Sequence, residues 1–136
     1  MPSVSVLSYD SKLGAYRNVD AGIEQTYARM SVVSGMVNFL WRASITAGTE
    51  VSNIALRLND FTNVEHLDQY AGTIAHLSQD TPTDPTTPYR LHPIFLQQLT
   101  LGDRRSALYL MSHPGMFIPL KANANDLLQV SAQFIV

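Results

Sequence analysis

Apolar and polar residues alternate with a period of two along much of this chain, the pattern of a β-strand with one buried face. The alternation is clearest in residues 36–46, where one face carries Val37, Phe39, Trp41, Ala43 and Ile45. Similar runs, separated by residues typical of turns, predict strands at 3–8, 27–33, 36–46, 51–58, 89–100, 106–112, 116–120 and 127–136. The chain therefore reads as mainly β-structure.

Two turn signals link three of these strands. Ser34-Gly35 predicts a hairpin between residues 27–33 and 36–46, and Ala47-Gly48-Thr49 predicts a second turn before residues 51–58. These three strands are expected to form a meander. Arg42 and Arg57 would then lie on the polar faces of adjacent strands, where they are candidates for a subunit contact with Glu50 or Asp60.

About eight strands with short connections predict an all-β fold, an antiparallel β-sandwich of jelly-roll-like type. We expect residues 26–136 to form this domain and residues 1–25 to form an N-terminal arm or an edge strand. Within residues 62–77 the apolar spacing suits one short helix, but a long loop explains the sequence equally well. Residues 79–88 hold three of the seven prolines and predict an exposed loop.

Composition narrows the function classes. The 136 residues contain no cysteine, which removes disulfides and thiolate chemistry. A net charge of −2 gives no basic excess for nucleic acid, so we expect no nucleic-acid partner. Charged residues are only 15% of the chain, which favours a surface partly covered by another subunit and hence a homo-oligomer.

Nothing in the sequence predicts membrane insertion or export. Arg42 and Arg57 interrupt the two most apolar regions, so no stretch reaches the roughly 18 to 20 apolar residues of a membrane span. The first residues, Met1-Pro2-Ser3-Val4, lack the basic and apolar regions of a signal peptide.

We find no motif for catalysis, a cofactor or a metal. No two of the four histidines are three or four residues apart, and the nucleophile-elbow, P-loop and dinucleotide fingerprints do not occur. Asp80 and Asp84 could hold a cation weakly, but the need to keep this loop soluble explains the two aspartates as well. The sequence therefore predicts no catalytic residues, no metal site and no cofactor, and the chain is not expected to be an enzyme.

Three rings are candidates for ligand binding. Tyr70, Tyr89 and His92 lie in or beside expected loops, where flat side chains can stack on the apolar faces of sugar rings. For each ring taken singly, a structural role is the stronger explanation.

The order of elements resembles the small β-sandwich domains of siphophage receptor-binding and baseplate proteins. The resemblance covers about Arg29 to Val136 and is carried by the runs RMSVVSGMVNFLWRASITAGTEVSNIALRLNDF, YRLHPIFLQQLTL and RSALYLMSHPGMFIPLKANANDLLQVSAQFIV. It implies a tail or host-adsorption accessory protein of a phage of Gram-positive bacteria, located in the virion or, during assembly, in the host cytoplasm. Such domains are commonly trimeric and bind cell-wall saccharides, but they share no fixed saccharide-binding motif.

Three hypotheses follow. The first is an adsorption module that contacts a host-surface saccharide or another virion protein. The second is an architectural head or tail decoration protein without a ligand. The third is a small cell-wall hydrolase built from scattered carboxylates.

Overall fold

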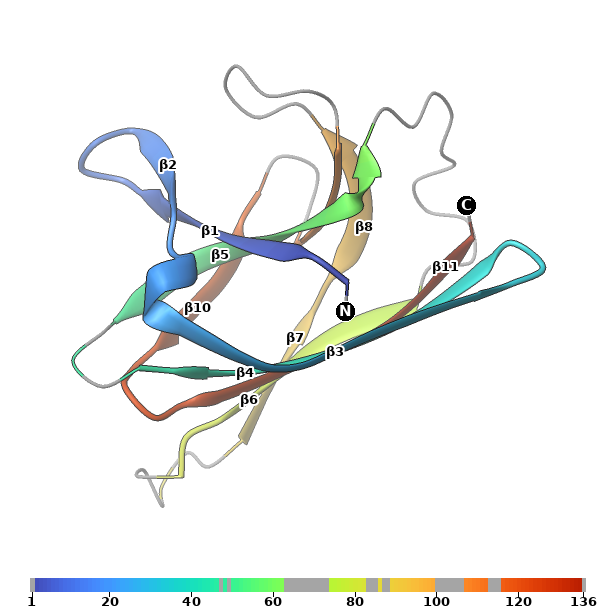
Figure 1. The fold of residues 1–136 in the computed structure, drawn as a ribbon. Helices are drawn as coiled ribbons and strands as arrows, with labels where there is room; N and C mark the ends of the chain where they lie inside the picture. The colour runs from blue at the N-terminus through green and yellow to red at the C-terminus, as the bar shows by residue number, and fades with distance from the viewer. Residues whose placement is uncertain are drawn as a thin grey trace.

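The computed structural model of the chain describes residues 2–46, 48, 50–62, 74–82, 86, 89–99, 107–112 and 116–135. Their regular structure is almost entirely antiparallel β, with one 3-10 turn, η1 (Asp20–Gly22), and no α-helix in the described ranges (Figure 1). The strands are β1 (Val4–Asp10), β2 (Ala15–Asn18), β3 (Ile23–Val33), β4 (Met36–Ile45), β5 (Val51–Thr62), β6 (Ile74–Asp80), β7 (Tyr89–Pro93), β8 (Phe95–Leu99), β9 (Ala107–Met111), β10 (Ile118–Ala122) and β11 (Leu127–Ile135).

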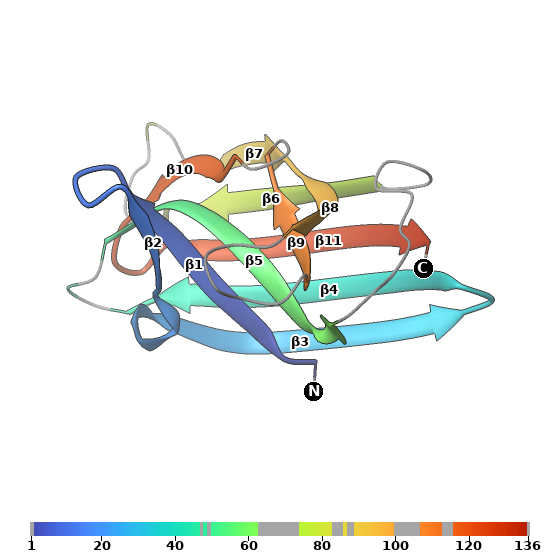
Figure 2. The same ribbon diagram turned by 90° about the horizontal axis from the view of Figure 1, so that it is seen from above.

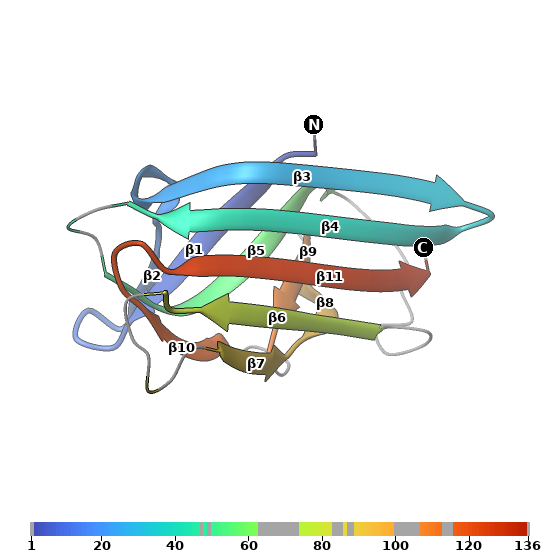
Figure 3. The same cartoon turned by 90° about the horizontal axis from the view of Figure 1, so that it is seen from below.

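The strands form two sheets packed face to face. The five-stranded sheet has the order β3-β4-β11-β6-β7, and the six-stranded sheet has the order β2-β1-β5-β9-β8, with β10 also paired to β5. Figures 2 and 3 show the molecule from its two sides, with β1 and β5 crossing obliquely over the long strands of the other sheet. This architecture confirms the prediction of an all-β sandwich.

Alternation along the strands produces the core. The predicted apolar face of β4 is buried, and it packs in one cluster with the inward-facing residues of β11, β5, β1 and β9. On β5 three consecutive residues, Ile54, Ala55 and Leu56, are fully buried, because the outer side of β5 belongs to a second, smaller cluster with Leu7, Tyr109 and Met111.

The predicted meander is wrong in its third strand. β3 and β4 do form a hairpin, in which Val33 pairs with Met36 across Ser34 and Gly35. However, β5 pairs with β1, β9 and β10 in the other sheet, and β4 pairs instead with the distant β11. Turn residues mark where a chain reverses, but they do not distinguish a hairpin from a connection that crosses between sheets.

Several boundaries also differ from the sequence prediction. The strand expected at 89–100 bends at the buried Ile94, so that β7 belongs to one sheet and β8 to the other. Such strands make the corners of sandwiches. Gln79 and Asp80 complete β6 rather than beginning a loop.

The sequence left alternatives open for residues 62–77 and for the first 25 residues, and the structure describes both regions in part. Within the interval 62–77, residues 74–77 belong to β6 and residue 62 ends β5, whereas 63–73 lie outside the described residues. In the first 25 residues, β1 lies between β2 and β5, β2 forms an edge of the six-stranded sheet, and β3 begins at Ile23.

Candidate functional site

The outer face of the five-stranded sheet, the side of the sheet that Figure 3 turns toward the viewer, carries polar side chains with some leucines among them. Strand pairing aligns its side chains in rows that cross the strands. One row runs Ser31, Asn38, Gln133; the next runs Arg29, Leu40, Ser131, His76; the third runs Tyr27, Arg42, Gln129, Ser78; and the fourth runs Ser44, Leu127, Asp80, Tyr89. We call these residues the outer face.

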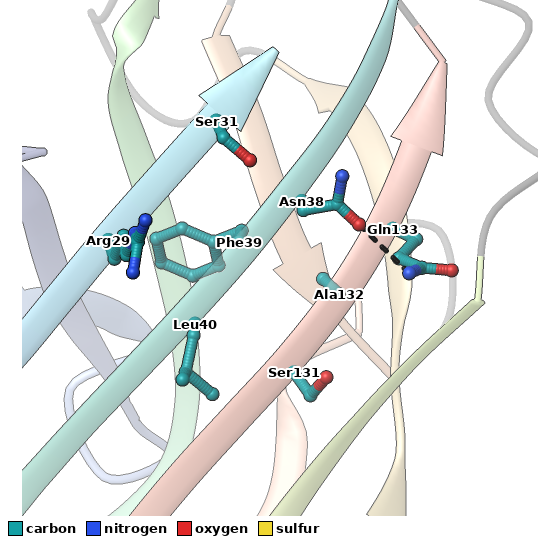
Figure 4. Close-up of a pocket in the computed structure, with 8 residues that line it drawn as sticks. All are labelled: Arg29, Ser31, Asn38, Phe39, Leu40, Ser131, Ala132 and Gln133. Atoms are coloured by element: carbon teal, nitrogen blue, oxygen red, sulfur yellow. Dashed lines mark hydrogen bonds between the residues drawn. The ribbon is translucent and has the colours of Figure 1, made fainter. Parts of the chain in front are cut away.

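A shallow pocket of about 240 Å³ lies over β3, β4 and β11 (Figure 4). Asn38 and Gln133 face each other across neighbouring strands, and Gln133 Nε2 donates a hydrogen bond to Asn38 Oδ1 at 2.8 Å. Arg29, Ser31 and Ser131 complete its polar lining. The bond fixes both amides, while Asn38 Nδ2 and Gln133 Oε1 keep a donor and an acceptor for a further partner.

A second pocket, of about 330 Å³, lies over the end of the sheet where β6 and β7 meet. Tyr89 is 59% exposed and lines this pocket together with Arg42, Asp80 and Gln129. One exposed ring therefore borders a set of hydrogen-bonding side chains. An aromatic ring beside a few fixed polar groups is the usual composition of a small-molecule site.

Arg42 is held in place by its two neighbours in the row. Its Nε donates to Gln129 Oε1 at 3.0 Å, and its guanidinium carbon lies 5.3 Å from the centre of the Tyr27 ring, a cation–π contact. These two contacts hold the guanidinium in one orientation, although the side chain is exposed.

Some of the candidate site residues predicted from the sequence lie close together in the structure, and others lie far apart. It brings Tyr89 and Arg42 to one pocket. Arg57, by contrast, lies in β5 of the other sheet, so the prediction that Arg42 and Arg57 sit on adjacent strands is wrong. Their suggested partners are engaged elsewhere: Glu50 pairs with Lys121 at 3.8 Å, and Asp60 accepts a hydrogen bond from the Ser3 N–H. Tyr70 lies outside the described residues.

His92 faces away from Tyr89. The two residues are three apart on one strand, so they project from opposite sides of it. The half-buried His92 ring lies 3.2 Å from Gln79 Oε1, and the buried Gln79 donates in turn to Asp126 Oδ2 and to the Lys121 carbonyl. Burial, and secondarily the positive charge of Arg90, lowers the pKa of His92 below 6.5. His92 thus belongs to a polar network inside one end of the sandwich.

Sequence reasoning did not find most of the outer face. Tyr27, Asn38, Gln129 and Gln133 all lie on the outward side of their strands, three of them half-buried and Gln133 exposed, and alternation along a strand could predict that direction. Their proximity could not, because it depends on the pairing of β4 with β11, which are about 90 residues apart in sequence.

Comparison with protein-family models, with curated proteins and with solved structures finds no match to this chain. Among the residues that the structure describes, no group of three or more histidine or acidic side chains is arranged to hold a metal ion. No helix in those ranges has the length and apolar character to cross a membrane.

Proposed function

We propose that this protein is a non-catalytic binding module that recognises a saccharide through the outer face of its five-stranded sheet. The observation that carries the proposal is the second pocket, where the exposed Tyr89 ring stands beside Arg42, Gln129 and Ser78. A ring can stack on the apolar face of a sugar, while guanidinium, amide and hydroxyl groups bind its hydroxyls.

The first pocket supports an extended ligand rather than a single sugar. Both pockets lie on one sheet face, and β4 and β11 contribute to each of them. The amides of Asn38 and Gln133 in one and of Gln129 in the other offer neutral donors and acceptors. These suit the hydroxyl groups of a neutral or weakly charged chain of sugars.

Binding is favoured over hydrolysis. Most glycosidases act with two carboxylates flanking the bond to be cut. The described residues that line the two pockets include one carboxylate, Asp80. Together with the resemblance to siphophage adsorption domains, this favours a host cell-wall saccharide as the ligand and a place in a phage particle.

A binding assay on isolated cell walls of Gram-positive bacteria tests the proposal. The wild-type protein is expected to be retained on the walls and released by soluble wall saccharide. Tyr89→Ala should weaken retention roughly tenfold, because it removes the stacking ring. Leu91→Ala is the matched control: Leu91 is also 59% exposed on β7 and on the same side of the sheet, yet it does not line the pocket.

Three results would count against the proposal. Absence of retention on walls from a broad panel of hosts would favour an architectural protein without a ligand, and a zymogram that shows clearing of wall polymer would favour a hydrolase. Equal retention of the Tyr89→Ala and wild-type proteins would place the binding site elsewhere.

A further inference from the structure

The five-stranded sheet ends on one side at β3, and no described strand pairs with the outer edge of β3 (Figure 3). This strand is 11 residues long and contains neither proline nor lysine. The other edge strands are shorter: β2 has 4 residues, β8 has 5, and β7 has 5 and ends in Pro93. Short strands, prolines and lysines are the usual devices that keep a sheet edge from pairing with another chain. Of the four edges, β3 is therefore the best suited to accept a further strand.

The backbone of β3 presents a regular row of outward-pointing groups from Tyr27 to its end. The two-residue turn makes Val33 and Met36 a hydrogen-bonded pair, and hydrogen-bonded pairs alternate along antiparallel strands. The odd-numbered residues of this part therefore direct their N–H and C=O groups toward β4. Those of Ala28, Met30 and Val32 point away from the sheet, and no described residue forms a hydrogen bond with them.

Apolar side chains accompany these backbone groups. Ala28 and Met30 face inward and pack against the core at the very edge of the sheet. The next inward-facing residue, Val32, is 55% exposed, and Val33, which faces outward, is 65% exposed. Two consecutive valines thus face solvent from opposite sides of the strand. A partner strand at this edge would cover both of them.

A second copy of β3 fits this edge when it runs antiparallel about a twofold axis at Met30. Met30 is the centre of the regular part of the strand, which extends from the irregularity before Tyr27 to the turn after Val33. In this register the outward groups of Ala28 meet those of Val32 of the second copy, and Met30 meets Met30. Every outward-pointing backbone group of the regular part then has a partner.

The side chains on the outer side favour the same register. Tyr27 lies opposite Val33 of the second copy, an aromatic and β-branched pair of the kind that stabilises sheets. Arg29 lies opposite Ser31. An axis at Arg29 would instead place two arginines opposite each other, which is destabilising, and an axis at Ser31 would leave Tyr27 without a partner.

We propose that β3 pairs with β3 of a second copy about an axis at Met30, so that the two five-stranded sheets form one continuous sheet. An isologous contact of this kind closes at two copies. Arg29 and Ser31 both line the first pocket, so their pairing brings the first pockets of the two copies side by side. This consequence rests on the proposed function: the two outer faces become one surface, on which a single saccharide chain can contact both copies.

Sedimentation velocity over a range of protein concentrations tests the pairing. The wild type is expected to change from monomer to dimer as concentration rises. Val32→Lys places a charge at the edge on an exposed side chain and should sediment as a monomer where the wild type is a dimer. Leu91→Lys is the matched control, because it adds the same charge at a side chain that is 59% exposed on β7, the opposite edge of the sheet, and it should dimerise like wild type.

Single cysteines test the register without disrupting the edge. The chain contains no cysteine, so a disulfide from one introduced cysteine must join two copies. Met30→Cys should oxidise to a covalent dimer, because opposite residues of a hydrogen-bonded pair have Cα atoms about 5.5 Å apart, within the range of disulfides. Arg29→Cys is the control: its two copies are diagonal neighbours, roughly 7–8 Å apart, and should not cross-link. Mixing Arg29→Cys with Ser31→Cys should restore the cross-link.

Several results would overturn the pairing: a wild type that stays monomeric or forms a trimer, a Val32→Lys protein that associates like wild type, or cross-linking that is faster for Arg29→Cys than for Met30→Cys. None of these measurements includes saccharide. A dimer that is not retained on cell walls would therefore contradict the proposed function alone, and a monomer that is retained would contradict the pairing alone.

Discussion

At the residue scale, a polar bridge joins the two sheets through the core. The buried Trp41 Nε1 donates to Gln25 Oε1 at 3.0 Å, and Gln25 Nε2 donates to the Val4 carbonyl at 2.9 Å. Trp41 lies in the five-stranded sheet and Val4 in the six-stranded sheet. Gln25 reaches both because β3 has an irregularity in its pairing between Gln25 and Tyr27.

Replacing Gln25 by leucine should lower the free energy of unfolding by about 1–3 kcal/mol, because it leaves the indole N–H buried without a partner. Urea denaturation measures the change. The same substitution in a Trp41→Phe background should cost less, since that background lacks the donor. An equal cost in both backgrounds would show that the bridge contributes no coupling.

His92 gives the second residue-scale prediction. Its pKa is lowered in the folded protein, by burial and then by Arg90, so the unfolded chain binds more protons than the native one near the ordinary value of 6.5. The stability associated with neutral His92 is present above 6.5 and is lost as the pH falls toward the lowered pKa.

Unfolding experiments between about pH 8 and about pH 5 should therefore show a smaller loss of stability for His92→Gln than for wild type. His76→Gln, which removes an exposed imidazole from the other side of the sheet, is the matched control. If the stability of His92→Gln depends on pH as that of wild type does, then burial beside Gln79 does not lower the pKa of His92 in the folded protein.

At the scale of elements, the β3–β4 hairpin shows how a local signal specifies a turn. Ser34 and Gly35 have φ of 51° and 78°, and a two-residue loop with both residues in the left-handed region is a type I′ turn. Glycine adopts this conformation freely and asparagine readily, whereas other side chains are strained by about 1–2 kcal/mol.

Ser34→Asn should therefore raise the free energy of unfolding by a fraction of that penalty, up to about 1 kcal/mol, and Gly35→Ala should lower it by about 1–2 kcal/mol. Thermal unfolding monitored by circular dichroism measures both. A lower stability of Ser34→Asn would mean that the serine has a role beyond the turn.

The elements also show the limit of sequence reasoning. The buried face of β4 could be predicted because alternation is local, and it is confirmed. Ala55 alternates with Ile54 and Leu56, a pattern that predicts an outward-facing position, but it is buried because β5 is covered on both faces. Alanine occurs at buried and at exposed positions, so its place in the alternating pattern does not show that a second cluster covers the outer side of β5.

At the scale of the whole molecule, pairing between distant segments creates the surface on which the proposed function rests. The outer face requires β11 to lie between β4 and β6. Sequence identified Tyr89 and Arg42 as separate candidates with different roles. Only the three-dimensional arrangement places them in one pocket.

The most direct measurement is a titration of the isotope-labelled protein with soluble cell-wall saccharide, followed by amide chemical shifts. We predict that the shifts that change belong to β4, β11, β6 and the start of β7, around Arg42, Gln129 and Tyr89, and that Tyr89→Ala reduces them. Changes confined to the six-stranded sheet, or no change at saturating saccharide, would contradict recognition by the outer face.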